Sequence, residues 1–61
     1  MNLIPINTSV TIIHTSIKGI VRSISITESG TEYLVRYFDR RDSPQQVWFL
    51  PSEIVEDKDI N

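Results

Sequence analysis

The chain contains no cysteine and only one histidine, His14. The absence of cysteine excludes disulfide bonds and cysteine-ligated zinc or iron–sulfur sites, and a single histidine cannot form a histidine-rich metal site. His14 has no acid or nucleophile at a recognisable spacing, and the sequence holds no glycine-rich phosphate loop. We therefore expect no metal, no cofactor, no catalytic residue and no enzymatic activity.

Long apolar runs are also missing from the sequence. No run approaches the length of about 20 residues that crosses a bilayer, and no stretch has the pattern of a signal peptide. We expect a cytoplasmic protein without a membrane partner. With 61 residues the chain forms one domain at most, and a domain of this size buries only about 60% of the surface of its unfolded chain. Its stability should come from a well-packed sheet, from self-association or from both.

The chain lacks a strong excess of charge of either sign, with a net charge of −2. Residues 18–41 carry five basic and three acidic side chains, a local charge of +2. Residues 42–61 carry one basic and five acidic side chains, a local charge of −4. Proteins that bind phosphate backbones usually present a clear positive stripe, and this modest asymmetry does not predict one by itself.

Residues with β-branched side chains are abundant: ten isoleucines, five valines and five threonines. Such side chains favour strands over helices, and apolar residues alternate along the chain instead of recurring at helical spacing. The sequence therefore predicts an all-β domain over residues 9–56, with an N-terminal arm at 1–8 and an acidic tail at 57–61. The predicted strands cover residues 9–14, 19–27, 32–38, 46–50 and 54–56.

Two glycines and one proline suggest how the strands are shaped and connected. Gly19 indicates a bulge or a close approach of two backbones, and Val21 and Ile24 can share one face only if a bulge separates them. Gly30 supplies the positive φ that a short hairpin needs. Pro51 suits the first position of a single helical turn before the last strand.

All five aromatic side chains lie in two neighbouring segments, residues 32–38 and 46–51. Alternation places Tyr33, Val35 and Tyr37 on one face of the first segment. Leu34, Arg36 and Phe38 lie on the other face, which Arg36 marks as the solvent side. We interpret the two segments as the two central strands of a small barrel.

Three motifs resemble those of Tudor, chromo-barrel and KOW modules. They are GIV at residues 19–21, YLVRYFD at residues 33–39 and VWFLPSEI at residues 47–54. The resemblance covers roughly residues 9–56 and implies a five-stranded SH3-like barrel with a short 3-10 turn before its last strand. In such modules aromatic side chains form a cage for methylated lysine or arginine, which by resemblance would use Trp48 with Tyr37 or Phe38, and Asp39. Fold is specified better than function, because SH3-like barrels carry many unrelated tasks.

The run VWFLP at residues 47–51 is more distantly similar to the fourth strand of the plasmid-encoded type II dihydrofolate reductases. These are small SH3-like chains that form tetramers around a central pore. Valine and proline agree, whereas the pore glutamine and tyrosine of that family are replaced here by Trp48 and Leu50. An oligomeric enzyme of this type is the last of our alternatives.

More apolar side chains are present than one small barrel can cover, and contiguous apolar patches usually mark contact sites. We therefore expect a binding or assembly module that contacts a protein partner, preferably a second copy of itself. The expected contact surface is the outer side of residues 32–38 and 46–50, centred on Trp48. The candidate residues are Trp48, Phe38, Leu50, Leu34 and Tyr37.

Nucleic-acid binding is the first alternative. Basic side chains near aromatic rings can combine phosphate pairing with base stacking. Asp39 and Asp42 are interleaved with these basic residues and can pair with them instead. The candidate residues are Lys18, Arg36, Arg40 and Arg41.

Overall fold

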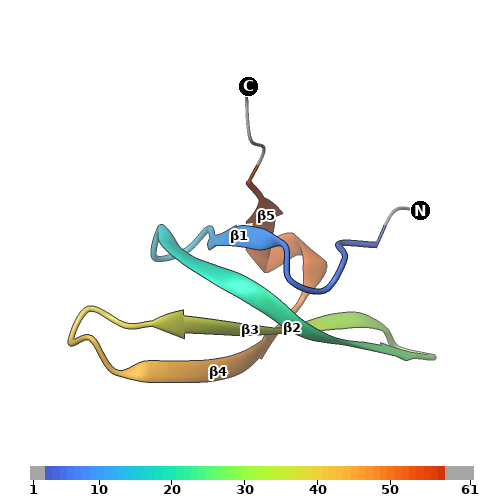
Figure 1. Cartoon of the computed structure of the whole chain (residues 1–61). Coiled ribbons are helices and arrows are strands. Elements are labelled where there is room, and N and C mark those ends of the chain that lie inside the picture. The colour runs from blue at the N-terminus through green and yellow to red at the C-terminus, as the bar shows by residue number, and fades with distance from the viewer. Residues whose placement is uncertain (1–2, 58–61) are drawn as a thin grey trace.

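The computed structural model describes residues 3–57 as an all-β fold of five strands and one 3-10 turn (Figure 1). All five predicted strands are present, and their ends differ from the prediction by at most two residues. The strands are β1 (Ser9–Ile12), β2 (Ile17–Thr27), β3 (Gly30–Phe38), β4 (Pro44–Phe49) and β5 (Ile54–Glu56). The 3-10 turn, Pro51–Glu53, begins at the predicted proline.

The five strands form one antiparallel sheet in the order β4-β3-β2-β1-β5. The expected closure into a barrel is wrong, because β4 pairs only with β3 and β5 pairs only with β1 in the described part of the chain. The chain crosses from one edge of the sheet to the other through the 3-10 turn, and all three residues of β5 are used to pair with β1. The sheet is therefore open, with β4 and β5 as its edges, and the predicted central position of residues 46–50 is wrong.

A bulge in β2 bends the sheet. Val21 pairs with Val35 and Ser23 pairs with Leu34, so Arg22 is the additional residue. This confirms the predicted bulge, and a bulge increases the local twist of a strand. In Figure 1, β2 runs from the level of β1 and β5 down to the level of β3 and β4, so one strand serves both halves of the sheet.

The core lies between these two halves and is made of alternate residues from four strands. Its buried members are Val10, Ile12, Val21, Tyr33, Val35 and Ile54. Side chains of intermediate burial surround them: Ile4, Ile17, Ile24, Tyr37 and Phe49. The inner face predicted from alternation in the third strand is confirmed, because Tyr33 and Val35 are buried.

Both glycines have the roles predicted from the sequence. A methyl group built on Gly19 would lie 2.6 Å from Cγ1 of Val35 and 2.8 Å from the carbonyl oxygen of Arg36, so β2 and β3 approach closely there. Gly30 has a φ of +126°, which side chains rarely tolerate, at the turn between β2 and β3.

The N-terminal arm is hydrogen-bonded to the sheet near the bulge. The Asn7 amide donates to the Val21 carbonyl at 2.7 Å, and the Val21 amide donates to the Thr8 carbonyl at 3.0 Å. Nearer the start of the chain, the Ile4 amide donates to the Tyr33 hydroxyl at 3.1 Å. The arm thus lies across the sheet and places Ile4 against the core.

The chain beyond β5 is bound to β1 through Asp57. Its amide donates to the Ser9 carbonyl at 2.9 Å. Its carboxylate accepts hydrogen bonds from the Thr11 hydroxyl at 2.6 Å and from the Ser9 hydroxyl at 2.8 Å. The Thr11 and Ser9 hydroxyls lower the pKa of Asp57 below its usual value. The rest of the predicted acidic tail, residues 58–61, lies outside the described residues.

Candidate interaction surface

The two faces of β3 differ in burial as the sequence predicts. Tyr33 and Val35 are buried on the inner face, whereas Arg36 and Phe38 are exposed on the outer face. Phe38 is 56% exposed, and Leu34 is intermediate. The outer face is thus the solvent side, and it carries large apolar groups.

Strand β4 adds an aromatic side chain to this outer face. In the register of the two strands Trp48 lies opposite Leu34, Gln46 opposite Arg36 and Pro44 opposite Phe38. Trp48 is 45% exposed, and Leu50, just after the strand, is 49% exposed. We call Leu34, Phe38, Trp48 and Leu50 the Trp48 face. Arg36 and Gln46 separate Phe38 from the contact between Leu34 and Trp48.

Tyr37 is the candidate partner-binding residue that lies elsewhere. It lies on the inner side of β3, with its ring centroid 6.2 Å from that of Phe49. The structure therefore does not bring Tyr37 together with Trp48, which the predicted aromatic cage would need. Phe38 shares a face with Trp48, but it pairs with Pro44, which lies four residues along β4 from Trp48.

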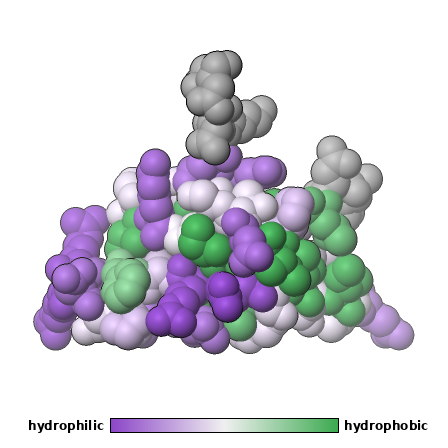
Figure 2. All heavy atoms as spheres, in the orientation of Figure 1, coloured by the Kyte–Doolittle hydropathy of each residue, from purple (hydrophilic) through white to green (hydrophobic). Residues whose placement is uncertain are grey.

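Strand β4 has no buried residue, although it belongs to the sheet. Even Val47, on the inner face opposite the fully buried Val35, is 39% exposed. No charged residue occurs from Ser43 to Ser52. Natural edge strands are usually protected by lysine, proline or a bulge, and here only Pro44, the first residue of β4, fits that description. Apolar side chains also reach the surface on other elements (Figure 2), including Ile6 in the arm.

The backbone groups along the free edge of β4 follow from its pairing with β3. Hydrogen-bonded and non-hydrogen-bonded pairs alternate in an antiparallel ladder. The Asp39 amide donates to the Ser43 carbonyl at 2.9 Å, and Pro44 has no N–H to donate. Ser43 therefore points its carbonyl toward β3, and every second residue after it does the same. The N–H and C=O groups of Gln45, Val47 and Phe49 thus point toward β3. The same groups of Gln46 and Trp48 point away from the sheet.

The four predicted nucleic-acid-binding residues divide between two depressions. Lys18 and Arg36 line a shallow depression of about 410 Å³ on the outer face of β2 and β3. Arg22 lines it as well, beside Ile20 and Phe38. Arg22 was not among the residues predicted from the sequence, although alternation from Lys18 through Ile20 to Arg22 places these three side chains on one exposed face. Arg40 and Arg41 line a different cleft.

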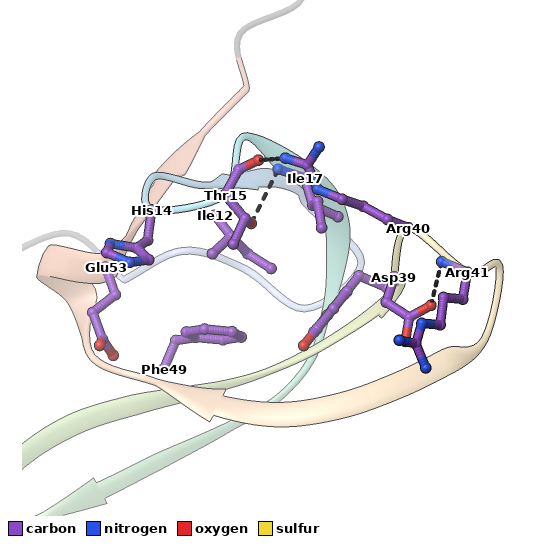
Figure 3. Close-up of a pocket in the computed structure, with 10 residues that line it drawn as sticks. Ile12, His14, Thr15, Ile17, Asp39, Arg40, Arg41, Phe49 and Glu53 are labelled. Carbon is purple, nitrogen blue, oxygen red and sulfur yellow. Dashed lines mark hydrogen bonds between the residues drawn. The ribbon is translucent and has the colours of Figure 1, made fainter.

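That second cleft, of about 510 Å³, lies between the turn after β1 and the turn after β3 (Figure 3). Arg40 joins the two turns, because its Nη2 donates to the Thr15 carbonyl at 3.1 Å. Figure 3 shows Phe49 at one side of the cleft, with His14 and Glu53 near each other. Tyr37 also lines it.

Asp39 at the cleft holds the β3–β4 turn together. Its Oδ1 accepts from the Ser43 amide at 3.0 Å and from the Arg41 amide at 2.9 Å. Its Oδ2 accepts from Nε2 of Gln45 at 3.1 Å. The Ser43 amide, with the Arg41 amide and the Gln45 side chain, lowers the pKa of Asp39. Because both carboxylate oxygens accept bonds from the turn, Asp39 has a structural role here.

Residues 3–57 contain neither a candidate metal cluster nor a candidate membrane-spanning helix. No group of three or more histidine, cysteine, aspartate or glutamate side chains in this range could hold a metal ion. None of the helical segments in the same range is long and apolar enough to cross a membrane. Comparison of the chain with protein-family models, curated proteins and solved structures finds no significant match.

Proposed function

We propose that this chain is a non-enzymatic assembly module that binds a second copy of itself through the Trp48 face and the free edge of β4. The observation that carries the proposal is that β4 is an uncharged edge strand without a buried residue, yet it bears the only tryptophan. An exposed apolar edge strand is a ready template for pairing with another chain.

The second copy is favoured as the partner because β4, the strand that would make the contact, carries no charged residue. A strand without charge meets its own copy without like-charge repulsion, whereas a charged partner would gain no ion pair along β4. Trp48 supplies the large ring that is typical of residues contributing most to binding energy. Self-association would also cover apolar surface that a chain of this size cannot bury alone.

The strand order supports an SH3-like fold that is left open at one side. The resemblance to Tudor, chromo-barrel and KOW modules implies a meander of four strands, a 3-10 turn and a short last strand. The chain has this order, with the 3-10 turn beginning at Pro51 and the last strand next to β1. We propose this relationship on topology and motifs together. In a closed barrel of this kind β4 would approach β5, the opposite edge of the sheet. The proposed assembly surface would thus lie on the strand that closure leaves free here.

Sedimentation equilibrium at micromolar concentration tests the proposed function. We expect a species of twice the chain mass of 7.0 kDa, and we expect Trp48→Ala to shift the protein toward the single chain. Ile26→Ala is the matched control, because Ile26 is an exposed apolar residue of β2 away from β4. A 7.0 kDa species alone in the wild-type protein would show that the module does not self-associate.

A second candidate function is nucleic-acid binding on the outer face of β2 and β3. Lys18, Arg22 and Arg36 gather there around one depression, with the exposed ring of Phe38 beside them. Such a site combines positive charge with a stacking platform. Single-stranded DNA should then bind with an affinity that falls as salt rises, and Arg36→Gln should lower the log–log slope by roughly one. Arg41→Gln, in the other cleft, is the control.

A further inference from the structure

We infer that β4 pairs antiparallel with β4 of a second copy about a twofold axis at Val47, so that two five-stranded sheets become one continuous ten-stranded sheet. This inference rests on the proposed function and specifies how the two copies meet. A twofold axis makes the contact isologous, so the same residues serve both copies. The assembly also stops at two copies, because each chain has one β4 and the twofold contact uses it.

The backbone of β4 selects this axis. Gln46 and Trp48 direct their N–H and C=O groups away from β3, because hydrogen-bonded and non-hydrogen-bonded pairs alternate along the two strands. An axis at Val47 places Gln46 of each copy opposite the partner's Trp48. Each of these two pairs exchanges two hydrogen bonds, so every free N–H and C=O of the two residues is used.

Other axes leave groups of this edge without partners. An axis at Gln46 would place Trp48 opposite the partner's Pro44, which has no N–H. An axis at Trp48 would place Gln46 opposite the partner's Leu50, whose N–H already donates to Oε1 of Glu53 at 2.7 Å. An axis between two residues would oppose outward groups to inward ones, which is incompatible with an antiparallel ladder. Pro44 at one end of this stretch and the hydrogen bond from Leu50 to Glu53 at the other thus confine the pairing to its centre.

The side chains fit the same axis. Val47 meets the partner's Val47 as a non-hydrogen-bonded pair, the closer of the two kinds of cross-strand pair. This contact would cover a side chain that is 39% exposed although it lies on the inner face of the sheet. On the outer face Trp48 lies beside the partner's Gln46, so the two Trp48 faces become adjacent on one side of the joined sheet.

Cysteine substitution tests the axis in a chain that has no cysteine of its own. In the expected register the two Cα atoms of residue 47 lie about 4.5 Å apart, within the range of about 4.4–6.8 Å that a disulfide spans. Oxidised Val47→Cys should therefore run as a covalent dimer. Gln45→Cys is the matched control on the same face of the strand, and it should not cross-link because residue 45 lies opposite the partner's Phe49.

Amide hydrogen exchange on the wild-type protein gives a second measurement that needs no substitution. The Val47 amide, which points toward β3, should be protected at all concentrations. The Gln46 and Trp48 amides should become protected only at concentrations where the dimer forms. Exposed Gln46 and Trp48 amides in the dimer would overturn the inference.

The outcomes separate this inference from the proposed function. If sedimentation gives a dimer but Gln45→Cys cross-links and Val47→Cys does not, the axis is wrong and self-association stands. If Val47→Cys is a dimer under reducing conditions and stays uncross-linked on oxidation, the axis is again wrong. A wild-type protein that remains a single chain would overturn both.

Discussion

Leu34 and Trp48 lie directly opposite each other on the outer face of β3 and β4, whereas the next residue of β3 on the N-terminal side, Tyr33, is buried in the core. Cross-strand pairs of this kind contribute roughly 0.2–1 kcal/mol. Loss of a buried aromatic side chain costs about 3–5 kcal/mol. We therefore expect Trp48→Ala to lower the free energy of unfolding by about 1 kcal/mol or less, and Tyr33→Ala to lower it several times more.

Urea denaturation at a concentration low enough for the single chain to dominate would measure both effects. Dilution is needed because self-association adds to apparent stability. If Trp48→Ala destabilises the chain as much as Tyr33→Ala does, Trp48 belongs to the core and the Trp48 face is wrongly assigned.

Gly19 has no room for a side chain. A methyl group added at Gly19 would lie 2.6 Å from the Val35 side chain and 2.8 Å from the carbonyl oxygen of Arg36. This oxygen belongs to the backbone and cannot move away without moving β3. Overpacking at such a site typically costs about 1–3 kcal/mol, so Gly19→Ala should lower the denaturation midpoint clearly. Ser25→Ala, farther along the same strand, is the control. A Gly19→Ala chain as stable as the wild type would show that β2 and β3 can separate there.

Much of this fold could be predicted from residue patterns because the patterns act locally. Alternation placed Tyr33 and Val35 on the buried face and Arg36 on the solvent face, since successive side chains of a strand point to opposite sides. The spacing of Val21 and Ile24 required a bulge for the same reason. Gly30 indicated a turn because few other residues accept its φ.

Closure of the sheet could not be predicted in the same way. Val47, Trp48 and Phe49 are all apolar, so alternation in β4 does not say which side is covered. Whether β4 meets β5 depends on how strongly the whole sheet curls, which many distant contacts determine together. Arg36 and Arg40 are close in the sequence, yet they line different depressions. Their separation likewise depends on the course of the whole sheet and not on their distance in the sequence.

The contact between the arm and the core gives a third prediction. The Tyr33 hydroxyl accepts a hydrogen bond from the Ile4 amide at 3.1 Å, and Ile4 packs against the core. Tyr33→Phe keeps the ring and removes the acceptor, at a cost of about 0.5–1.5 kcal/mol for one hydrogen bond. The Ile4 amide should then exchange faster with solvent, while the Val35 amide keeps its protection. Unchanged exchange at Ile4 would mean that the arm is held without Tyr33.

Asp57 should make the stability of the sheet depend on pH. The Thr11 and Ser9 hydroxyls lower the pKa of its carboxyl group in the folded chain, whereas in the unfolded chain the pKa returns to about 3.9. A lowered folded pKa means that the carboxylate stabilises the fold above about pH 3.9, and that this contribution is lost as the pH falls through the lower folded value. Asp57→Asn should therefore be less stable than the wild type near neutral pH, and the difference should shrink in acid.

Urea denaturation of both proteins across this pH range measures the difference in stability, with Glu28→Gln in the exposed β2–β3 turn as the control. A difference between wild type and Asp57→Asn that stays constant down to about pH 2 would show that the bonds to Ser9 and Thr11 do not depend on the charge.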